Sequence, residues 1–296
     1  MNKKKINFVI TDLDDTIWDW LTMWYSSFKP YLDDIAREFG IDEGTLKADF
    51  KQLHEKYGTS EASYIYNELT SLTDEQKAII DNHNASDSIM HRYNSSKKHS
   101  LRLYESVYET LQHIKSKGAL LVGFTESNDF FTRYRLTHLR LDGIFDAIYT
   151  PKGYELPESV KRRYDDEFWE VSKTKISHLK QDFRKPDEHI LNEIIADYSG
   201  NKESTIYIGD KLHKDIYMAQ QANVVSVHAE YGHMISTREY KLLQDVTHWT
   251  LADVERERNF REEMKLMQIP DPNYVLRTHY SELLNYFDFE SFTQKT

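Results

Sequence analysis

The sequence of 296 residues contains no cysteine, only 6 prolines and 10 glycines, and no long hydrophobic run. The absence of cysteine excludes disulfides, thiolate metal sites and cysteine nucleophiles. No apolar stretch approaches the length of a membrane span, so we expect no membrane association through such a segment. The basic start, MNKKKINFVI, leads into an apolar run that is too short for a signal peptide. These observations predict a soluble, cytoplasmic protein.

Basic residues are in the minority, because 38 Lys and Arg stand against 49 Asp and Glu, which gives a formal net charge of -11. Such a charge disfavours nucleic acid as a general partner, since its phosphate backbone is itself negative. The length is sufficient for two domains or for one domain with a large insertion. Composition leaves the oligomeric state open and is compatible with an oligomer.

A short apolar run, residues 6–10, ends in three acids, Asp12, Asp14 and Asp15. The run of β-branched and aromatic residues predicts a strand buried on both faces. Carboxylates this close repel one another, and a bound cation would relieve that repulsion. Asp12 and Asp14 are two positions apart, so in extended chain their side chains share a side, where one could attack phosphorus while the other handles a proton. The alternative is a solvated acidic turn.

Two later apolar runs end in a similar way. Residues 119–124 predict a buried strand that is followed by Thr125, and residues 205–209 predict another that is followed by Asp210, with Asp215 five positions on. Ligands in open α/β sheets bind beyond the carboxyl ends of the strands, so we expect these side chains to meet Asp12 at one edge. Taken alone, Thr125 could equally be a turn or helix-capping residue.

Lys185 lies in the sequence Arg-Lys-Pro at 184–186, directly before a predicted helix with two acids in its first turn. Proline at the first turn fixes the start of a helix, so Lys185 is held at that start. The alternative is an ordinary surface lysine.

The pattern between residues 18 and 100 is helical, with apolar residues at intervals of three and four. We therefore predict a helical cap over 18–100 and an α/β core made of 1–17 and 101–250. Residues 94–98 read as a hinge or connector, and a charged insert over about 150–182 has apolar residues, Ile176 among them, that indicate a helix. Residues 251–296 are predicted to form a C-terminal helical extension.

Four motifs together resemble the haloacid dehalogenase (HAD) superfamily: DLDDT at 12–16, GFT at 123–125, RKP at 184–186 and GDKLHKD at 209–215. The resemblance implies a Rossmann-like parallel sheet core with an inserted helical cap of the C1 type. Within that family the residue two positions after the nucleophile sorts the reaction, and Asp14 matches the phosphatase and phosphomutase pattern rather than that of the dehalogenases.

The resemblance also implies roles for the acids. Asp12 would be the nucleophile that forms an aspartyl-phosphate, and Asp14 would protonate the leaving oxygen and later deprotonate water. The cofactor would be Mg²⁺, held by Asp12, Asp210 and the backbone carbonyl of Asp14.

Three further roles follow from the same resemblance. Thr125 would bind a phosphoryl oxygen, Lys185 would neutralise charge on that group and on Asp12, and Asp215 would orient Lys185 or a metal-bound water. The sequence departs from the family pattern at Glu126, where asparagine is frequent, and at Lys211, where a small hydroxyl residue is frequent.

The sequence therefore predicts a Mg²⁺-dependent phosphomonoester hydrolase that acts on a small phosphorylated metabolite through an aspartyl-phosphate. Two alternatives stay open at this point. One is a phosphomutase or phosphotransferase, which passes the phosphoryl group to a second hydroxyl. The other is a non-catalytic regulatory or scaffold protein that has kept the fold.

Overall fold

A computed structural model describes residues 3–62, 64–82, 86–153, 170–180, 183–232, 238–250, 255 and 271–293. Its centre is a seven-stranded sheet in the order β5-β4-β3-β2-β6-β7-β8, in which every neighbouring pair is parallel. The strands are β2 (Phe8–Thr11), β3 (Leu120–Phe124), β4 (Ala147–Pro151), β5 (Lys175–Leu179), β6 (Thr205–Gly209), β7 (Val225–Ala229) and β8 (Tyr274–Leu276). A separate parallel pair joins β1 (Lys4–Ile6) to β9 (Phe287–Phe289).

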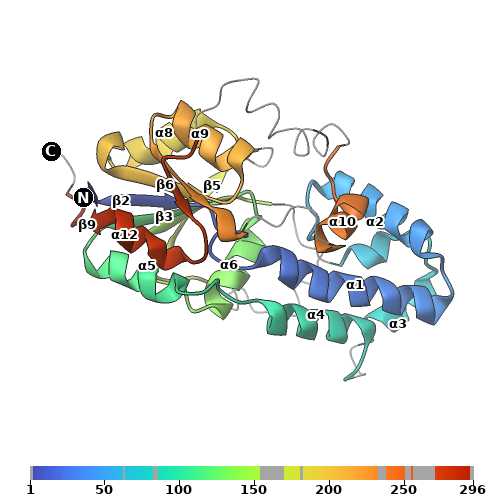
Figure 1. The fold of residues 1–296 in the computed structure, drawn as a ribbon. Helices are drawn as coiled ribbons and strands as arrows, with labels where there is room; N and C mark the ends of the chain where they lie inside the picture. The colour runs from blue at the N-terminus through green and yellow to red at the C-terminus, as the bar shows by residue number, and fades with distance from the viewer. Residues whose placement is uncertain are drawn as a thin grey trace.

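Helices cover both faces of the main sheet, which explains why β2 and β6 are buried along their whole length. Figure 1 shows α8 and α9 on one face, with α5 and α12 on the other. The helices that flank the sheet are α5 (Val107–Ser116), α6 (Asp129–His138), α8 (Glu188–Asp197), α9 (Tyr217–Gln221) and α12 (Leu283–Tyr286). The predicted α/β fold with a Rossmann-like parallel sheet is confirmed.

A group of helices follows β2 directly and lies to one side of the sheet (Figure 1). Its members are α1 (Trp20–Phe39), α2 (Glu43–Tyr57), the 3-10 turn η1 (Ile65–Glu68), α3 (Asp74–Ile80) and α4 (Ile89–Ser100). Trp20, Trp24 and Phe28 stack along α1, with ring centroids 6.2 and 4.9 Å apart. The helix ends at Gly40, whose left-handed φ of 62° suits a residue without a Cβ.

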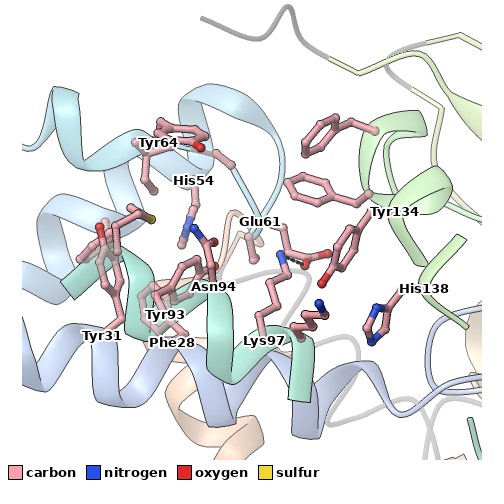
Figure 2. Close-up of a pocket in the computed structure, with 18 of the residues that line it drawn as sticks. Phe28, Tyr31, His54, Glu61, Tyr64, Tyr93, Asn94, Lys97, Tyr134 and His138 are labelled. Carbon is pink, nitrogen blue, oxygen red and sulfur yellow. Dashed lines mark ion pairs between the residues drawn. The ribbon is translucent and has the colours of Figure 1, made fainter. Parts of the chain in front are cut away.

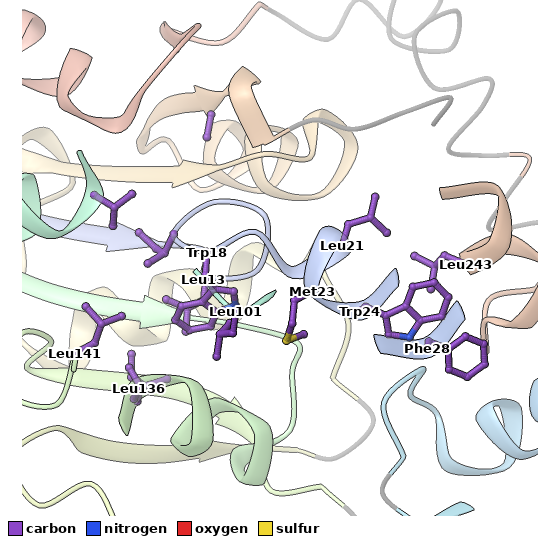
Figure 3. Packing of buried hydrophobic residues seen from close by; sticks show 14 of the residues in the cluster. Leu13, Trp18, Leu21, Met23, Trp24, Phe28, Leu101, Leu136, Leu141 and Leu243 are labelled. Atoms are coloured by element: carbon purple, nitrogen blue, oxygen red, sulfur yellow. The ribbon is translucent and has the colours of Figure 1, made fainter. Parts of the chain in front are cut away.

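Buried apolar side chains connect the sheet with the helical group. Figure 3 shows them from Leu13 and Trp18 beside the sheet to Trp24 and Phe28 within the helices. All four side chains are nearly inaccessible to solvent. The cap and the core therefore share apolar packing at their boundary.

Helix α10 (Arg238–Val246) lies apart from the sheet and packs against α2 and α1 (Figure 1). His54 Nδ1 lies 2.6 Å from the carbonyl oxygen of Val246, and Lys47 pairs with Asp245 at 3.3 Å. The sequence pattern placed this helix in the core segment 101–250. We propose that α10 belongs to the cap, together with α1–α4.

Two local predictions were wrong, and a third does not hold for all of its described residues. Residues 94–98, predicted as a connector, lie in α4, because Ser88 caps the helix and its few apolar residues suffice to pack against α1. Ile176, predicted in a helix, lies in β5, where it pairs with Ile148; the rest of that predicted helix lies largely outside the described residues. Of the predicted C-terminal helical extension, 251–296, the structure describes residue 255, which is helical, and 271–293, which contain β8 and β9 as well as helical turns, because short apolar stretches complete two sheet edges. None of the helices in the described ranges is long and apolar enough to span a membrane.

Candidate active site

Three predicted residues follow adjacent strands at one edge of the sheet. Thr11 of β2 is in register with Gly123 of β3 and with Ile208 of β6. Asp12, Thr125 and Asp210 come one or two residues later, just past the strand ends. The backbone N–H of Asp12 continues the ladder by donating to the carbonyl of Ile208 at 2.8 Å. The parallel register thus brings residues from three distant parts of the chain to one place.

Lys185 reaches the same place from the loop before α8. Its Nζ lies 2.5 Å from Oδ1 of Asp12 and 2.9 Å from Oδ1 of Asp215, and the residue is only 6% exposed. Burial alone would lower the pKa of this ammonium, but the two carboxylates outweigh that effect and raise the pKa well above its ordinary value. Lys185 is therefore charged at neutral pH.

Asp215 is positioned by a π-helical turn, η4 (Leu212–Ile216). Its Oδ2 accepts from the backbone N–H of Lys211 at 3.1 Å, and its Oδ1 accepts from the hydroxyl of Tyr207 at 2.8 Å. A Cβ on Gly209 would lie 2.4 Å from the Cβ of Asp215, so only glycine permits this approach.

Asp12, Asp210 and Asp215 each offer a carboxylate oxygen, and these oxygens lie within 4.8 Å of one another. Burial, with help from the neighbouring carboxylates, raises the pKa of Asp12 although Lys185 opposes it. Burial also raises the pKa of Asp210 to about 6, against the nearby ammonium of Lys211. Buried carboxylates crowded in this way are suited to a hard divalent cation, because its charge offsets their repulsion.

Asp14 points to a different set of partners. Its Oδ1 accepts from Trp18 Nε1 at 2.6 Å and lies 3.1 Å from Nη1 of Arg135. Its Oδ2 accepts from Ser127 Oγ at 2.6 Å and from Thr125 Oγ1 at 3.4 Å. These contacts hold the carboxylate in one orientation, and Thr125 links it to the sheet edge that carries Asp12.

Arg135 was not among the predicted site residues. It lies in α6, is fully buried, and uses Nη2 to pair with Glu61, a cap residue that follows α2. Glu61 is paired in turn with Lys97 of α4 at 3.0 Å. Burial would raise the pKa of Glu61, but Arg135 and Lys97 lower it to about 2. A sequence signal existed, because an arginine four residues after buried Phe131 lies on the buried face of the helix.

Glu126, where the sequence departs from the family pattern, is partly buried and supports Lys185. Its Oε1 accepts from the backbone N–H of Lys185 at 3.0 Å, and its Oε2 pairs with Lys214 at 2.8 Å. Burial opposes ionisation, yet Lys214 and Lys185 lower the pKa of Glu126 to about 2. A charged carboxylate therefore fixes the backbone from which Lys185 extends.

The turn after Asp12 is held by hydrogen bonds to the carboxylates of Asp12 and Asp15. Thr16 Oγ1 donates to Oδ2 of Asp12 at 3.4 Å, and Asp15 takes a left-handed φ of 57° while its Oδ1 accepts from the backbone N–H of Leu21 at 3.0 Å. Burial raises the pKa of Asp15 to about 8. These contacts turn the chain from β2 into α1.

The model of the haloacid dehalogenase-like hydrolase family matches residues 9–158 and 173–229. No curated protein sequence matches this chain. A HAD phosphatase from Thermococcus onnurineus is similar in structure at 17% sequence identity and a TM-score of 0.52, covering 97% of this chain and 100% of that chain. A Bacillus subtilis structure described as HAD-hydrolase YfnB bound to magnesium covers 93% of this chain and 96% of its own, at 14% identity and a TM-score of 0.48. At such identity the first likeness shows the fold.

Proposed function

Because this chain belongs to the family of haloacid dehalogenase-like hydrolases, we propose that it is a Mg²⁺-dependent phosphatase that hydrolyses a small phosphorylated metabolite. The observation that carries the proposal is the meeting of Asp12, Lys185, Asp210 and Asp215 at the carboxyl edge of the sheet. A dehalogenase is disfavoured because a second carboxylate, Asp14, follows the first by two residues.

Asp12 is the proposed nucleophile. One of its oxygens contacts Lys185, and the other accepts from Thr16, so the carboxylate is oriented from two sides. Attack on phosphorus expels the alcohol and leaves an aspartyl-phosphate, which water then hydrolyses. The fixed ammonium of Lys185 stabilises negative charge that develops on the phosphoryl oxygens, and Thr125 offers them a hydroxyl donor.

Asp14 is the proposed acid and base. It would give a proton to the leaving oxygen and take one from the attacking water. Trp18, Ser127 and Arg135 keep its carboxylate in place for both transfers.

The three clustered carboxylates fit a hard divalent cation, as argued above. Mg²⁺ would be held by Asp12 and Asp210, with the backbone carbonyl of Asp14, and Asp215 lies within the same cluster. The ion would supply positive charge beside the phosphoryl group when bound.

The proposal is tested by release of inorganic phosphate from an aryl phosphate with and without Mg²⁺. We expect turnover that falls to background in Asp12→Asn, and that falls strongly in Asp14→Asn while Mg²⁺ binding is retained. Asp288→Asn is the matched control, since Asp288 is exposed on β9. Activity of Asp12→Asn equal to wild type would refute the nucleophile, and absence of phosphate release across a broad ester panel would refute the function.

A further inference from the structure

A cavity of about 430 Å³ lies between the cap helices and α6 of the core (Figure 2). Aromatic side chains form a large part of its wall, among them Phe28, Tyr31, Tyr64, Tyr93, Phe131 and Tyr134. A volume of this size is typical of a site for a small organic molecule. No residue of the proposed phosphoryl site lines it, so its role is a separate question.

The inner wall of the cavity is connected to Asp14 through the ion pairs of Arg135. Glu61 lines the cavity, and the guanidinium of Arg135 lies between Glu61 and Asp14, with one terminal nitrogen in contact with each carboxylate. Lys97 completes this wall and lies 4.6 Å from the ring centroid of Phe131. The cavity is thus on the side of the site where the proposed acid protonates the leaving oxygen.

The wall is formed by two parts of the molecule. Glu61 comes from the cap, whereas Arg135 comes from α6 of the core. A cap movement that separates this pair would join the cavity to the space beside Asp14. The leaving group of a bound ester could then extend from the phosphoryl site into the cavity.

Two polar side chains of the cavity wall, Ser60 and His54, are engaged by the protein. The Ser60 hydroxyl lies 3.0 Å from Thr247 Oγ1 and 3.2 Å from His248 Nδ1, and His54 is bonded through Nδ1 to the carbonyl of Val246. Burial lowers the pKa of His54 to about 4, so its ring is neutral. Ligand hydroxyl groups placed beside Ser60 and His54 would lose water where these two side chains already have partners, which penalises polyhydroxylated ligands at this part of the wall.

We propose that this cavity binds the alcohol half of the substrate and selects a flat aromatic group over a polyhydroxylated sugar. The inference rests on the proposed phosphatase activity. Aromatic walls give a planar ring apolar contact and edge or face packing, while Asn94 and Lys98 at the exposed rim meet polar substituents at its outer end. The substrate class is therefore an aromatic alkyl phosphate.

The first test compares kcat/KM for three primary alkyl phosphates, so that intrinsic reactivity is similar: ethyl phosphate, 2-phenylethyl phosphate and glucose 6-phosphate. We expect 2-phenylethyl phosphate to exceed ethyl phosphate by tenfold or more, as burial of an added ring in an apolar pocket implies, and glucose 6-phosphate to show no such gain. A glucose 6-phosphate value equal to or above that of 2-phenylethyl phosphate would overturn the inference.

The second test narrows the cavity. Ala62 lines it and is half-buried, so Ala62→Phe places a ring where the substrate ring would lie. The ratio of the 2-phenylethyl to the ethyl phosphate value should fall at least tenfold. Ala48→Phe is the matched control, because Ala48 is exposed on α2 and does not line the cavity. An unchanged ratio in a folded Ala62→Phe protein contradicts the inference.

A third measurement separates failure of the inference from failure of the proposed function. Calorimetry measures the binding of free 2-phenylethanol to the wild-type protein without any turnover. This binding should be lost in Ala62→Phe. Suppose that ethyl phosphate is hydrolysed in an Asp12-dependent manner, that 2-phenylethanol does not bind, and that 2-phenylethyl phosphate is not preferred to ethyl phosphate. Only the cavity assignment then fails. If no ester is hydrolysed, the phosphatase proposal fails, and binding of the alcohol still decides whether the cavity accepts an aromatic group.

Discussion

Replacement of Arg135 by methionine should destabilise the protein far more than the loss of an exposed arginine. The guanidinium is fully buried and is paired with both Asp14 and Glu61. Removal of one partner from a buried ion pair costs about 3–5 kcal/mol, because the remaining charge is buried without compensation. Arg102→Met is the control: Arg102 is largely exposed beside Asp19, and its loss should cost about 1 kcal/mol or less.

The pKa of Glu61 reports how far Arg135 and Lys97 together stabilise its charged form. Its pKa is about 2 in the folded protein against an ordinary value of 4.5. A difference of about 2.5 units at 1.36 kcal/mol per unit corresponds to roughly 3 kcal/mol. Because the folded pKa is the lower one, this stabilisation is fully present above pH 4.5 and is lost as the pH falls towards 2.

Urea unfolding followed by tryptophan fluorescence measures these changes, since Trp18 and Trp20 contact the carboxylates of the same cluster. In Arg135→Met with Glu61→Gln, the uncompensated cap carboxylate is absent, so the double variant should be more stable than the sum of the single changes by about 1–3 kcal/mol. Additivity within about 0.5 kcal/mol would refute the coupling between core and cap through this pair.

Three further outcomes are expected. Gly232→Ala should lower the free energy of unfolding by about 1–3 kcal/mol in a urea titration, because a Cβ there would lie 1.7 Å from the carbonyl oxygen of Asp15; unchanged stability would contradict the close approach. Glu126→Ala should reduce kcat at least tenfold with the fold retained, because the backbone N–H of Lys185 loses its acceptor, and circular dichroism checks the fold. Asp210→Asn should weaken Mg²⁺ binding at least tenfold in calorimetry, and wild-type affinity in this variant would exclude the cluster as the cation site.

The part of the site that follows strand ends was readable from the sequence. Apolar runs that stop at Asp12, Thr125 and Asp210 carry both the strand and its end in a few adjacent residues, and a parallel sheet aligns such ends at one edge. The position of Lys185 could also be predicted from the sequence, because Pro186 marks the start of a helix beside it. The family model over residues 9–158 and 173–229 confirms the resemblance carried by these motifs.

Contacts between distant residues were not readable in this way. Arg135 and Glu61 are 74 positions apart, and no sequence motif predicts that they pair. β8 is only three residues long and joins the sheet through β7, so no apolar run of ordinary strand length marked it. Helix α10 is amphipathic, but the sequence does not state which apolar surface it covers. The Arg135–Glu61 pair, the place of β8 in the sheet and the position of α10 all depend on tertiary contacts. The local sequence pattern does not encode such contacts.

Because α10 packs on the helical group α1–α4, the polypeptide passes more than once between that group and the sheet with its flanking helices. The chain enters the helical body before Trp20, leaves it after Ser100, enters again before α10 and leaves again before β8. Excision of residues 18–100 as one cassette would strip the apolar side of α10, including Tyr240, Leu243 and Val246, of its covering.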